Sequence, residues 1–199
     1  MKGEVFMKRV PDPEIRKRQI LEKAMELFYE KGYENTSLDD IARELNVVKS
    51  LCYRYYDSKQ TLFAAVLSEY TQECCSELIK ILKDRQRGLG DRLEAVLRML
   101  ITPAEAGRYH DFFHKEGNES MHDQLAVRMC RLMMPDMVAE VDYFLRSGDD
   151  AAAGDPKTQA LAHFLLYGMI GVWLESGEDA ESEVQEFRKT ADTALSAAR

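Results

Sequence analysis

The segment Thr36–Leu62 holds the side chains that most clearly predict a chemistry. Four of them would share the outward face of one short helix: Lys49, Ser50, Tyr53 and Arg54. Cationic, hydroxyl and phenol groups donate hydrogen bonds to phosphate oxygens and to base edges. The pattern therefore indicates contact with double-stranded DNA. The competing interpretation is an ordinary helical hairpin with a solvated polar face.

Two roles are expected within this segment. We expect Lys49 and Ser50 to touch base edges in the major groove. Phosphate contacts are expected from Thr36, Ser37, Tyr53, Tyr55 and Lys59. Base contacts set the sequence preference, whereas phosphate contacts set overall affinity and its dependence on salt.

A second candidate chemistry is metal binding near the middle of the chain. His110 and His114 are four residues apart and would share a helix face, with His122 or Glu116 as a further ligand. No third ligand follows at a fixed spacing. The pattern favours histidines that line a pocket or lie on the surface, so we expect no metal and no cofactor.

The adjacent Cys74 and Cys75 are candidate oxidant sensors. A reactive thiol needs a nearby cation or a helix N-terminus, whereas Glu73 and Glu77 flank this pair, so ordinary packing is favoured. The chain also has no Gly-x-Ser-x-Gly, phosphate-binding loop or HExxH motif. We therefore expect no enzymatic activity.

Two short helices around a tight turn would position the DNA-facing side chains. Ser37 and Asp40 are typical of a capping box at the start of the first helix. Its apolar face comprises Leu38, Ile41, Ala42 and Leu45. Asn46 tolerates the left-handed backbone that the turn needs. The second helix, at about Val48–Tyr56, would bury Val47, Cys52 and one edge of Tyr56, which makes a helix-turn-helix.

The run from Ile20 to Tyr70 resembles the DNA-binding domain of the tetracycline-repressor (TetR) family of transcriptional regulators. The matching stretches are ILEKAMELFYEKGYENTS, LDDIARELNV, VKSLCYRYYDSK and QTLFAAVLSEY. Four positions depart from the residues usual in the family: Asn46 for Gly, Val48 for a small hydroxyl residue, Cys52 for Leu or Ile, and Tyr56 for Phe. Val48 lacks the hydroxyl that would supply a helix cap or a phosphate contact.

Composition predicts an all-α fold, because the chain is 45% hydrophobic and has almost no β-branched runs. The net charge of −8 is unevenly divided: residues 1–60 carry 12 basic and 11 acidic side chains, and residues 61–199 carry 15 and 24. DNA contact must then come from a local cationic face. Four cysteines without a CxxC spacing, no signal peptide and no membrane span predict a cytoplasmic protein that has no membrane partner.

Three regions are predicted along the chain: a flexible lead at residues 1–12, a helix-turn-helix domain at 13–57, and an effector-binding and dimerisation domain at 58–199. About nine to ten helices are expected in all. Gly88 and Gly90 should break the long helix that leaves the first domain, and a loop is expected at 147–156. Beyond the helix-turn-helix, helices are expected at 13–31, 58–83, 93–101, 124–146 with a restart or kink at Pro135, 160–174 and 181–197.

The stretch at residues 160–174 is apolar on nearly every side, yet it is too short to span a bilayer. It is buried all round if one face meets its own core and the other meets a second copy. The expected interface residues are Phe164, Gly168 and Gly171, and the TetR resemblance implies the same use of the late helices. The alternative is a central core helix of a monomer.

The second domain is rich in methionine and aromatic side chains. They form either a plain core or an adaptable pocket for an apolar or amphipathic effector. The second interpretation predicts ligand contacts at His110, Phe113 and Trp173.

Together these patterns predict an all-α homodimeric transcriptional regulator, a repressor rather than an activator. A small-molecule effector would release it from a near-palindromic operator whose half-sites lie about 34–36 Å apart. The alternative is a helical ligand-binding or protein-interaction module without DNA binding.

Overall fold

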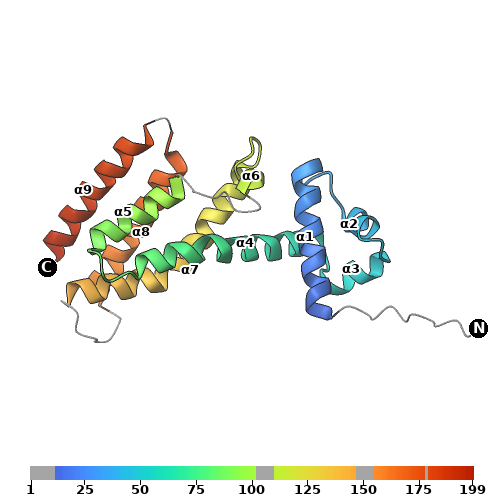
Figure 1. Cartoon of the computed structure of the whole chain (residues 1–199), viewed down its shortest axis with the longest axis horizontal. Helices are drawn as coiled ribbons and strands as arrows, with labels where there is room; N and C mark the ends of the chain where they lie inside the picture. Colours follow the sequence, from blue (N-terminus) through green and yellow to red (C-terminus); the bar gives the residue numbers. More distant parts are fainter. Residues whose placement is uncertain (1–11, 102–109, 147–154, 178) are drawn as a thin grey trace, which may run out of the picture. The chain divides into compact units, whose positions relative to one another are not determined.

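The structure is a computed structural model, and it describes residues 12–101, 110–146, 155–177 and 179–199. Every regular element in these ranges is a helix, in the order α1 to α9 (Figure 1). Eight helices have seven residues or more and α6 is a single turn, so the number of full helices is slightly below the nine to ten expected. The predicted all-α fold class is confirmed.

Two predicted irregular segments fall largely outside the described residues. They are the lead at 1–12 and the loop at 147–156. Two described residues at their edges are helix caps. The carboxylate of Asp12 accepts a hydrogen bond from the Glu14 N–H at 2.9 Å, and that of Asp155 accepts one from the Lys157 N–H at 3.2 Å. The helices that follow thus begin where these side chains satisfy their first N–H groups.

The chain divides into two compact units, Met1–Leu67 and Ser68–Arg199. The first contains α1 (Pro13–Lys31), α2 (Leu38–Glu44), α3 (Lys49–Tyr55) and the first turns of α4 (Lys59–Leu82). The predicted boundary at residues 57/58 lies just before α4, whereas the units separate within that helix. The reason is packing, because the Phe63 ring lies 5.0 Å from the Tyr33 ring and 6.1 Å from the Phe28 ring.

The second unit contains the rest of α4 and the remaining helices. These are α5 (Leu89–Ile101), α6 (His110–Phe113), α7 (Glu119–Leu145), α8 (Pro156–Glu175) and α9 (Ala180–Ala198). Helix α8 packs along α7, and α9 packs against α5 and α8 (Figure 1). Fully buried aliphatic and methionine side chains form the core between them, among them Leu93, Leu97, Met133, Met137, Leu166 and Met169.

The predicted helix break at Gly90 is wrong, and of the restart or kink predicted at Pro135 the restart does not occur. Helix α5 already begins at Leu89, so Gly90 lies inside it. A Cβ at Gly90 would lie 2.8 Å from Arg188 Nε and would also clash with Asp192, so the close approach of α9 explains this glycine. Helix α7 begins at Glu119 and continues through Pro135. The buried Met133 and Met137 on either side of the proline hold both halves against the same core.

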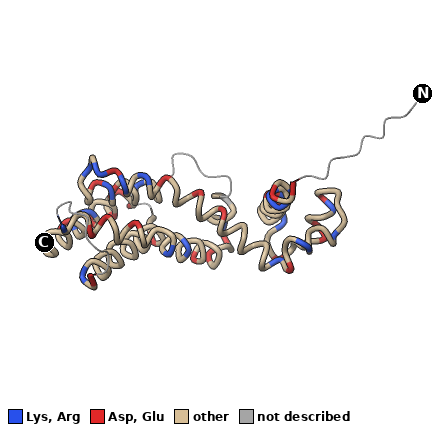
Figure 2. Tube along the Cα trace, turned by 90° about the horizontal axis from the view of Figure 1, so that it is seen from below, with Lys and Arg blue, Asp and Glu red and all other residues tan. Residues whose placement is uncertain are grey.

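Charged residues of both signs are interspersed along the chain, and neither sign forms a separate block (Figure 2). Any cationic surface is therefore local, as the charge count predicts. Within the described ranges, no helix combines the length and the apolar character that a bilayer crossing requires.

Candidate nucleic-acid interface

Helix α2 begins with the predicted capping box. Ser37 Oγ accepts a hydrogen bond from the Asp40 N–H at 3.2 Å, and Asp40 Oδ2 accepts one from the Ser37 N–H at 3.0 Å. The Ser37 hydroxyl also donates to Asp40 Oδ2 at 2.5 Å, and these hydrogen bonds hold the pKa of Asp40 below its ordinary value. Two otherwise unsatisfied N–H groups are thus paired locally, which fixes the start of the helix.

The turn between α2 and α3 is built around Asn46. Its φ angle of +52° is the only positive value among the described residues that are not glycine, as predicted for this position. The N–H of Val47 donates to the Ala42 carbonyl at 2.9 Å and closes the turn. Val47 itself is half-buried rather than buried.

Val48 is the N-cap residue of α3, and its side chain makes no capping hydrogen bond. The Val48 side chain is 70% exposed, so an apolar isopropyl group lies at the surface where a capping hydroxyl would otherwise be. This agrees with the missing hydroxyl noted in the sequence. The first turn of α3 therefore keeps N–H groups that a phosphate oxygen could accept from.

The two faces of α3 differ sharply in exposure. Cys52 is fully buried and Tyr56, just after the helix, is 3% exposed. Lys49, Ser50 and Tyr53 are exposed on the opposite face, together with Arg54. This is the outward set that the sequence predicts, and the buried pair lies on the face of α3 that is turned away from solvent.

Thr36 does not fit the phosphate role expected for it. Its side chain is only 2% exposed, and its hydroxyl donates to the carbonyls of Leu27 and Gly32 at 3.2 and 3.0 Å. These bonds fasten the chain leaving α1 to the end of that helix. Thr36 positions the interface from below, because burial leaves its hydroxyl out of reach of DNA.

Lys59 is also committed to the fold. Its ammonium group donates to the carbonyls of Tyr33 and Glu34 at 2.9 and 3.2 Å and lies 4.3 Å from the centre of the Tyr33 ring. The side chain is 20% exposed. A phosphate contact would compete with these bonds, so the sequence pattern missed a structural role for this lysine.

The other three expected phosphate contacts are accessible: Tyr53 lies on the exposed face of α3, and Ser37 and Tyr55 lie nearby. Ser37 is exposed, although its hydroxyl is engaged in the capping box. Tyr55 is half-buried, and the Arg54 guanidinium lies 5.3 Å from the centre of its ring. Both sit beside the exposed face of α3 rather than on it.

The helices that build this interface match a known protein family. Residues 20–66 match the family described as "Bacterial regulatory proteins, tetR family". These residues therefore form a TetR-family DNA-binding domain. The matched residues run from α1 to the first turns of α4 and contain the whole helix-turn-helix.

Individual relatives agree with this assignment. The chain is 38% identical over 63 residues to IcaR of Staphylococcus aureus, "Biofilm operon icaADBC HTH-type negative transcriptional regulator", a match that covers 32% of this chain and 31% of IcaR. It is 24% identical over 163 residues to the regulator YuxN of Bacillus subtilis, covering 80% of this chain and 54% of YuxN. The matches thus span a third to a half of these relatives.

The fold of the whole chain has solved counterparts. A TetR-family regulator from Pectobacterium atrosepticum superposes with a TM-score of 0.59 over 93% of this chain and 94% of that one, at 22% identity. At this identity the likeness establishes the fold alone.

The second unit contains a cavity of about 200 Å³. Its wall comprises Tyr70, Glu73, Cys74, Glu77, Leu78, Met99, Leu100, His110, His114, Leu125, Met129 and Trp173. Two of the three predicted contacts, His110 and Trp173, are among them. Phe113 is not, because it is buried and stacks behind the wall on Tyr70, with ring centroids 4.8 Å apart.

The wall residues on α4 were missed as a set, although they follow a helical spacing. Tyr70, Glu73, Cys74 and Glu77 recur at intervals of three and four, which places them on one face of the helix. The same spacing also fits a helix packed on a core. Only the surrounding helices decide that this face borders a cavity.

The histidines form a stacked cluster at the edge of this cavity. The rings of His110 and His114 lie 3.8 Å apart, and Nε2 of His114 lies 3.1 Å from Nε2 of His122. The His122 ring lies 4.7 Å from that of Trp173. Among the described residues, no three His, Cys, Asp or Glu side chains are arranged to hold a metal ion.

The cysteine pair has little thiolate character. Cys75 is fully buried, and burial raises the pKa of its thiol to about 12. Burial likewise raises the pKa of Cys74, which outweighs its hydrogen bond with Tyr70. Both thiols are thus protonated at neutral pH, which favours packing over oxidant sensing.

Helix α8 is half exposed in the single chain. Leu165, Leu166 and Met169 are fully buried, whereas Phe164 and Tyr167 are 54% and 53% exposed. Gly168 is exposed on the same side, and a Cβ at Gly171 would meet nothing within 4 Å. Nothing within the described chain therefore requires a glycine at position 171.

Proposed function

We propose that this TetR-family chain is a homodimeric transcriptional repressor whose α3 helices read a near-palindromic operator and whose second unit binds an effector that releases the DNA. The observation that carries the proposal is the exposed polar face of α3, with Lys49, Ser50 and Tyr53 outward and Cys52 buried. A solvated hairpin would need no such grouping of donors. The family match over the same helices supports the DNA-binding role.

Repression is favoured over activation by one relative. IcaR is described as a negative transcriptional regulator, and it is 38% identical to this chain over 63 residues. That match covers 31% of IcaR, so it supports the mode of DNA binding and carries nothing about the operon that this chain would control.

Within the interface, Lys49 and Ser50 are the proposed base contacts. Tyr53, Tyr55 and Ser37 are the proposed phosphate contacts, while Thr36 and Lys59 hold the supporting turns. The division follows exposure, because the first two lie at the outward N-terminal end of α3 and the hydroxyls of the others flank it.

A shift assay on the DNA upstream of the gene tests this division. Lys49→Ala and Ser50→Ala should each cost about 1–3 kcal/mol on the preferred site and relax the preference at one position. Tyr53→Phe should weaken binding to all sequences alike. Lys189→Ala, which removes an exposed charge from α9, is the control and should leave binding unchanged. Equal losses on specific and scrambled DNA for all three interface variants would contradict the assignment.

Dimerisation through α8 is the second part of the proposal. The exposed Phe164 and Tyr167 form an apolar stripe beside Gly168 and Gly171, a surface that a second copy could cover. Gly171→Asp should produce folded monomers with little operator affinity, because the added carboxylate would be buried between the two copies. Gly177→Asp adds the same charge just after α8, where a Cβ also meets nothing within 4 Å, and should remain dimeric. A Gly171→Asp protein that is still dimeric at nanomolar concentration would exclude this interface.

Release by an effector is the third part. Helix α4 runs without interruption from Lys59 to Leu82, so one helix carries residues of the DNA-binding unit and of the cavity wall. A ligand that favours one state of the dimer must then bind more weakly in the presence of operator. Coupling of about 1–3 kcal/mol would weaken DNA binding about 5- to 150-fold. Calorimetric titration with and without operator tests this, and equal affinities would exclude a switch.

A further inference from the structure

Val48, the residue that precedes α3, has an exposed apolar side chain at the end of the helix that carries the proposed base contacts. We propose that Val48 contacts the C5-methyl group of a thymine in the major groove and thereby selects a T·A pair in each operator half-site. This inference rests on the proposed function. It adds a specificity-determining residue and the base that this residue selects.

Neither capping nor burial explains a valine at position 48. Valine is among the least favourable residues at an N-cap, and the Val48 side chain makes no capping hydrogen bond. It is 70% exposed, more than any other large apolar side chain in the described ranges. Its neighbour Val47 is half-buried, so one valine already packs at this turn. Val48 therefore contributes little to the stability of the first unit, and its apolar surface is available to a partner.

The turn holds Val48 in a fixed position. Asn46 has a φ angle of +52°, and the N–H of Val47 donates to the Ala42 carbonyl at 2.9 Å, which fastens the start of α3 to α2 (Figure 1). The carbonyl of Val48 accepts a hydrogen bond from the Leu51 N–H at 2.9 Å. A β-branched side chain has few χ1 rotamers, so Val48 loses little conformational entropy when it makes a contact. The isopropyl group is thus preorganised for contact with a partner.

The position of Val48 in the helix-turn-helix directs this surface to the bases. A recognition helix lies in the major groove with its N-terminal residues against base edges. Lys49 and Ser50, the two proposed base contacts, directly follow Val48 and are exposed with it. Docking that brings Lys49 and Ser50 to base edges therefore brings Val48 into the same groove.

The chemistry of the side chain specifies the base. In the major groove, base pairs present hydrogen-bond donors and acceptors, and thymine adds an apolar C5-methyl group. The isopropyl group of Val48 has neither donor nor acceptor. It gains free energy by covering the methyl group, and it loses free energy where it would cover a polar atom that then has no partner. Contact with Val48 thus favours thymine over the other three bases.

Replacing thymine by deoxyuridine tests this contact, because the replacement removes the C5-methyl group and keeps the hydrogen-bonding groups. The full-length wild-type protein first selects its preferred duplex from a library of random sequence. Each thymine of that duplex is then replaced in turn, and fluorescence anisotropy gives the dissociation constants. We expect one thymine in each half-site at which the replacement weakens binding about 4-fold, and about 15-fold when both half-sites are changed.

Two variants of Val48 and one control complete the test. Val48→Ala and Val48→Ser should bind the thymine and deoxyuridine duplexes about equally. The serine variant also adds a capping hydroxyl, so poor folding of α3 would not explain its loss of the methyl preference. Val127→Ala truncates an exposed valine of α7 in the second unit and should keep the wild-type ratio of affinities.

Two results would overturn this proposal alone. One is a wild-type protein that binds every deoxyuridine duplex as tightly as the thymine duplex, and the other is a methyl preference that persists unchanged in both Val48 variants. In both cases the selected duplex would still bind more tightly than scrambled DNA, as the proposed function requires. A wild-type protein that selects no sequence at all would overturn the proposed function and this inference together.

Discussion

The polar contacts within each of the two compact units differ in how far apart in the sequence the paired residues lie. In the first unit, the caps join residues two or three positions apart, as between Ser37 and Asp40. In the second, Glu140 binds Arg85 and Arg92 from 55 and 48 residues away, and Arg188 of α9 binds Asp91 from 97 residues away. Lys59 binds the Tyr33 carbonyl in the first unit from 26 residues away, a shorter separation than those of Glu140 and Arg188, so the second unit depends more on contacts between helices that are distant in the sequence.

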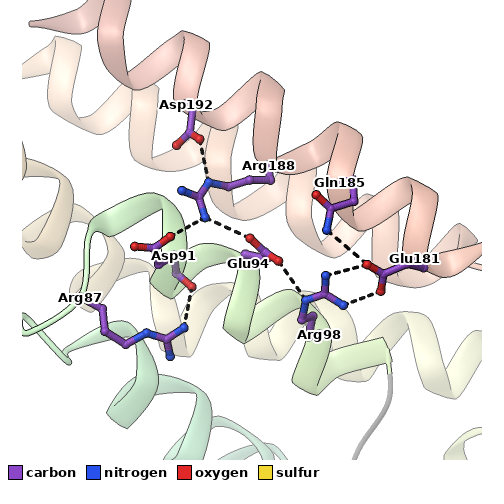
Figure 3. A network of polar contacts seen from close by, with 8 residues as sticks. All are labelled: Arg87, Asp91, Glu94, Arg98, Glu181, Gln185, Arg188 and Asp192. Carbon is purple, nitrogen blue, oxygen red and sulfur yellow. Dashed lines mark hydrogen bonds and ion pairs between the residues drawn. The ribbon is translucent and has the colours of Figure 1, made fainter.

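The second unit itself contains two kinds of polar network. Glu140 is buried: Arg92 Nη1 donates to it at 2.7 Å and Arg85 Nη2 at 3.0 Å. Burial alone would raise the pKa of Glu140, but the hydrogen bonds from the two arginines outweigh it and leave that pKa lowered. The network between α5 and α9 is mostly at the surface, where Arg188 bridges Asp91, Glu94 and Asp192 (Figure 3). Hydrogen bonds of similar length therefore stabilise the protein by different amounts in the two networks, because solvent screens only the charges between α5 and α9.

The largest effect is expected from Glu140→Ala. Removing this carboxylate leaves the Arg92 guanidinium, 4% exposed, without its partner in the core. We expect a loss of about 3–5 kcal/mol in the free energy of unfolding, measured with denaturant. Arg85→Ala removes the more exposed partner, 43% exposed, and should cost clearly less. Similar losses for both variants would mean that burial does not determine how much each contact contributes to the free energy of unfolding.

A smaller loss is expected from Gly90→Ala. The new methyl group would meet Arg188 and Asp192 of α9, and such overpacking costs about 1–3 kcal/mol, of which better helix propensity returns up to about 1. Thermal unfolding should show a net destabilisation. Gly177→Ala, where no atom lies within 4 Å of the new Cβ, is the control. A stabilised Gly90→Ala protein would show that the Arg188 and Asp192 side chains of α9 move aside at little cost.

In the first unit, Ser37→Ala should cost about 1 kcal/mol, because it removes the hydroxyl that caps α2. Hydrogen exchange should rise at the first N–H groups of α2 and hardly change in α5 or α9. The exposed Ser50→Ala serves as the control for loss of a hydroxyl. A rise in exchange spread over both units would contradict the local character of this cap.

The smallest effect on stability is expected at the surface pair of Arg98 and Glu181. Hydrogen bonds from Arg98, and then from Gln185, lower the pKa of Glu181 to about 2 (Figure 3). Since the folded value is below the unfolded one, any stabilisation is present above about pH 4.5 and is lost as the pH falls toward 2. In Arg98→Gln, carboxyl titration by NMR should return the pKa of Glu181 toward its ordinary value, with stability at neutral pH almost unchanged. If the pKa of Glu181 is the same in both proteins, Arg98 does not pair with Glu181 in solution.

Several features were predictable because their causes are local. The bounds of α1, the capping box of α2, the left-handed Asn46 and the missing cap at Val48 all follow from residues within a few positions of one another. The outward face of α3 was predictable for the same reason, since helical spacing alone separates Lys49 from Cys52. The structural roles of Lys59 and Thr36 were not predictable, because their partners are carbonyl groups, which no pattern of side chains reveals.

The all-α fold, the helix-turn-helix and the outward face of α3 follow from the sequence alone. Short-range capping, helical periodicity and turn preference act between near neighbours and can be followed along the chain. Packing in three dimensions was needed to show that Gly90 lies inside a helix, that α7 continues through Pro135, and that Glu140 is paired with two arginines in the core. The same holds for the cavity that Glu73, Glu77 and Trp173 border. Each of these depends on which distant helices pack together, and a helical period is the same whether its face meets a core, a cavity or a second chain.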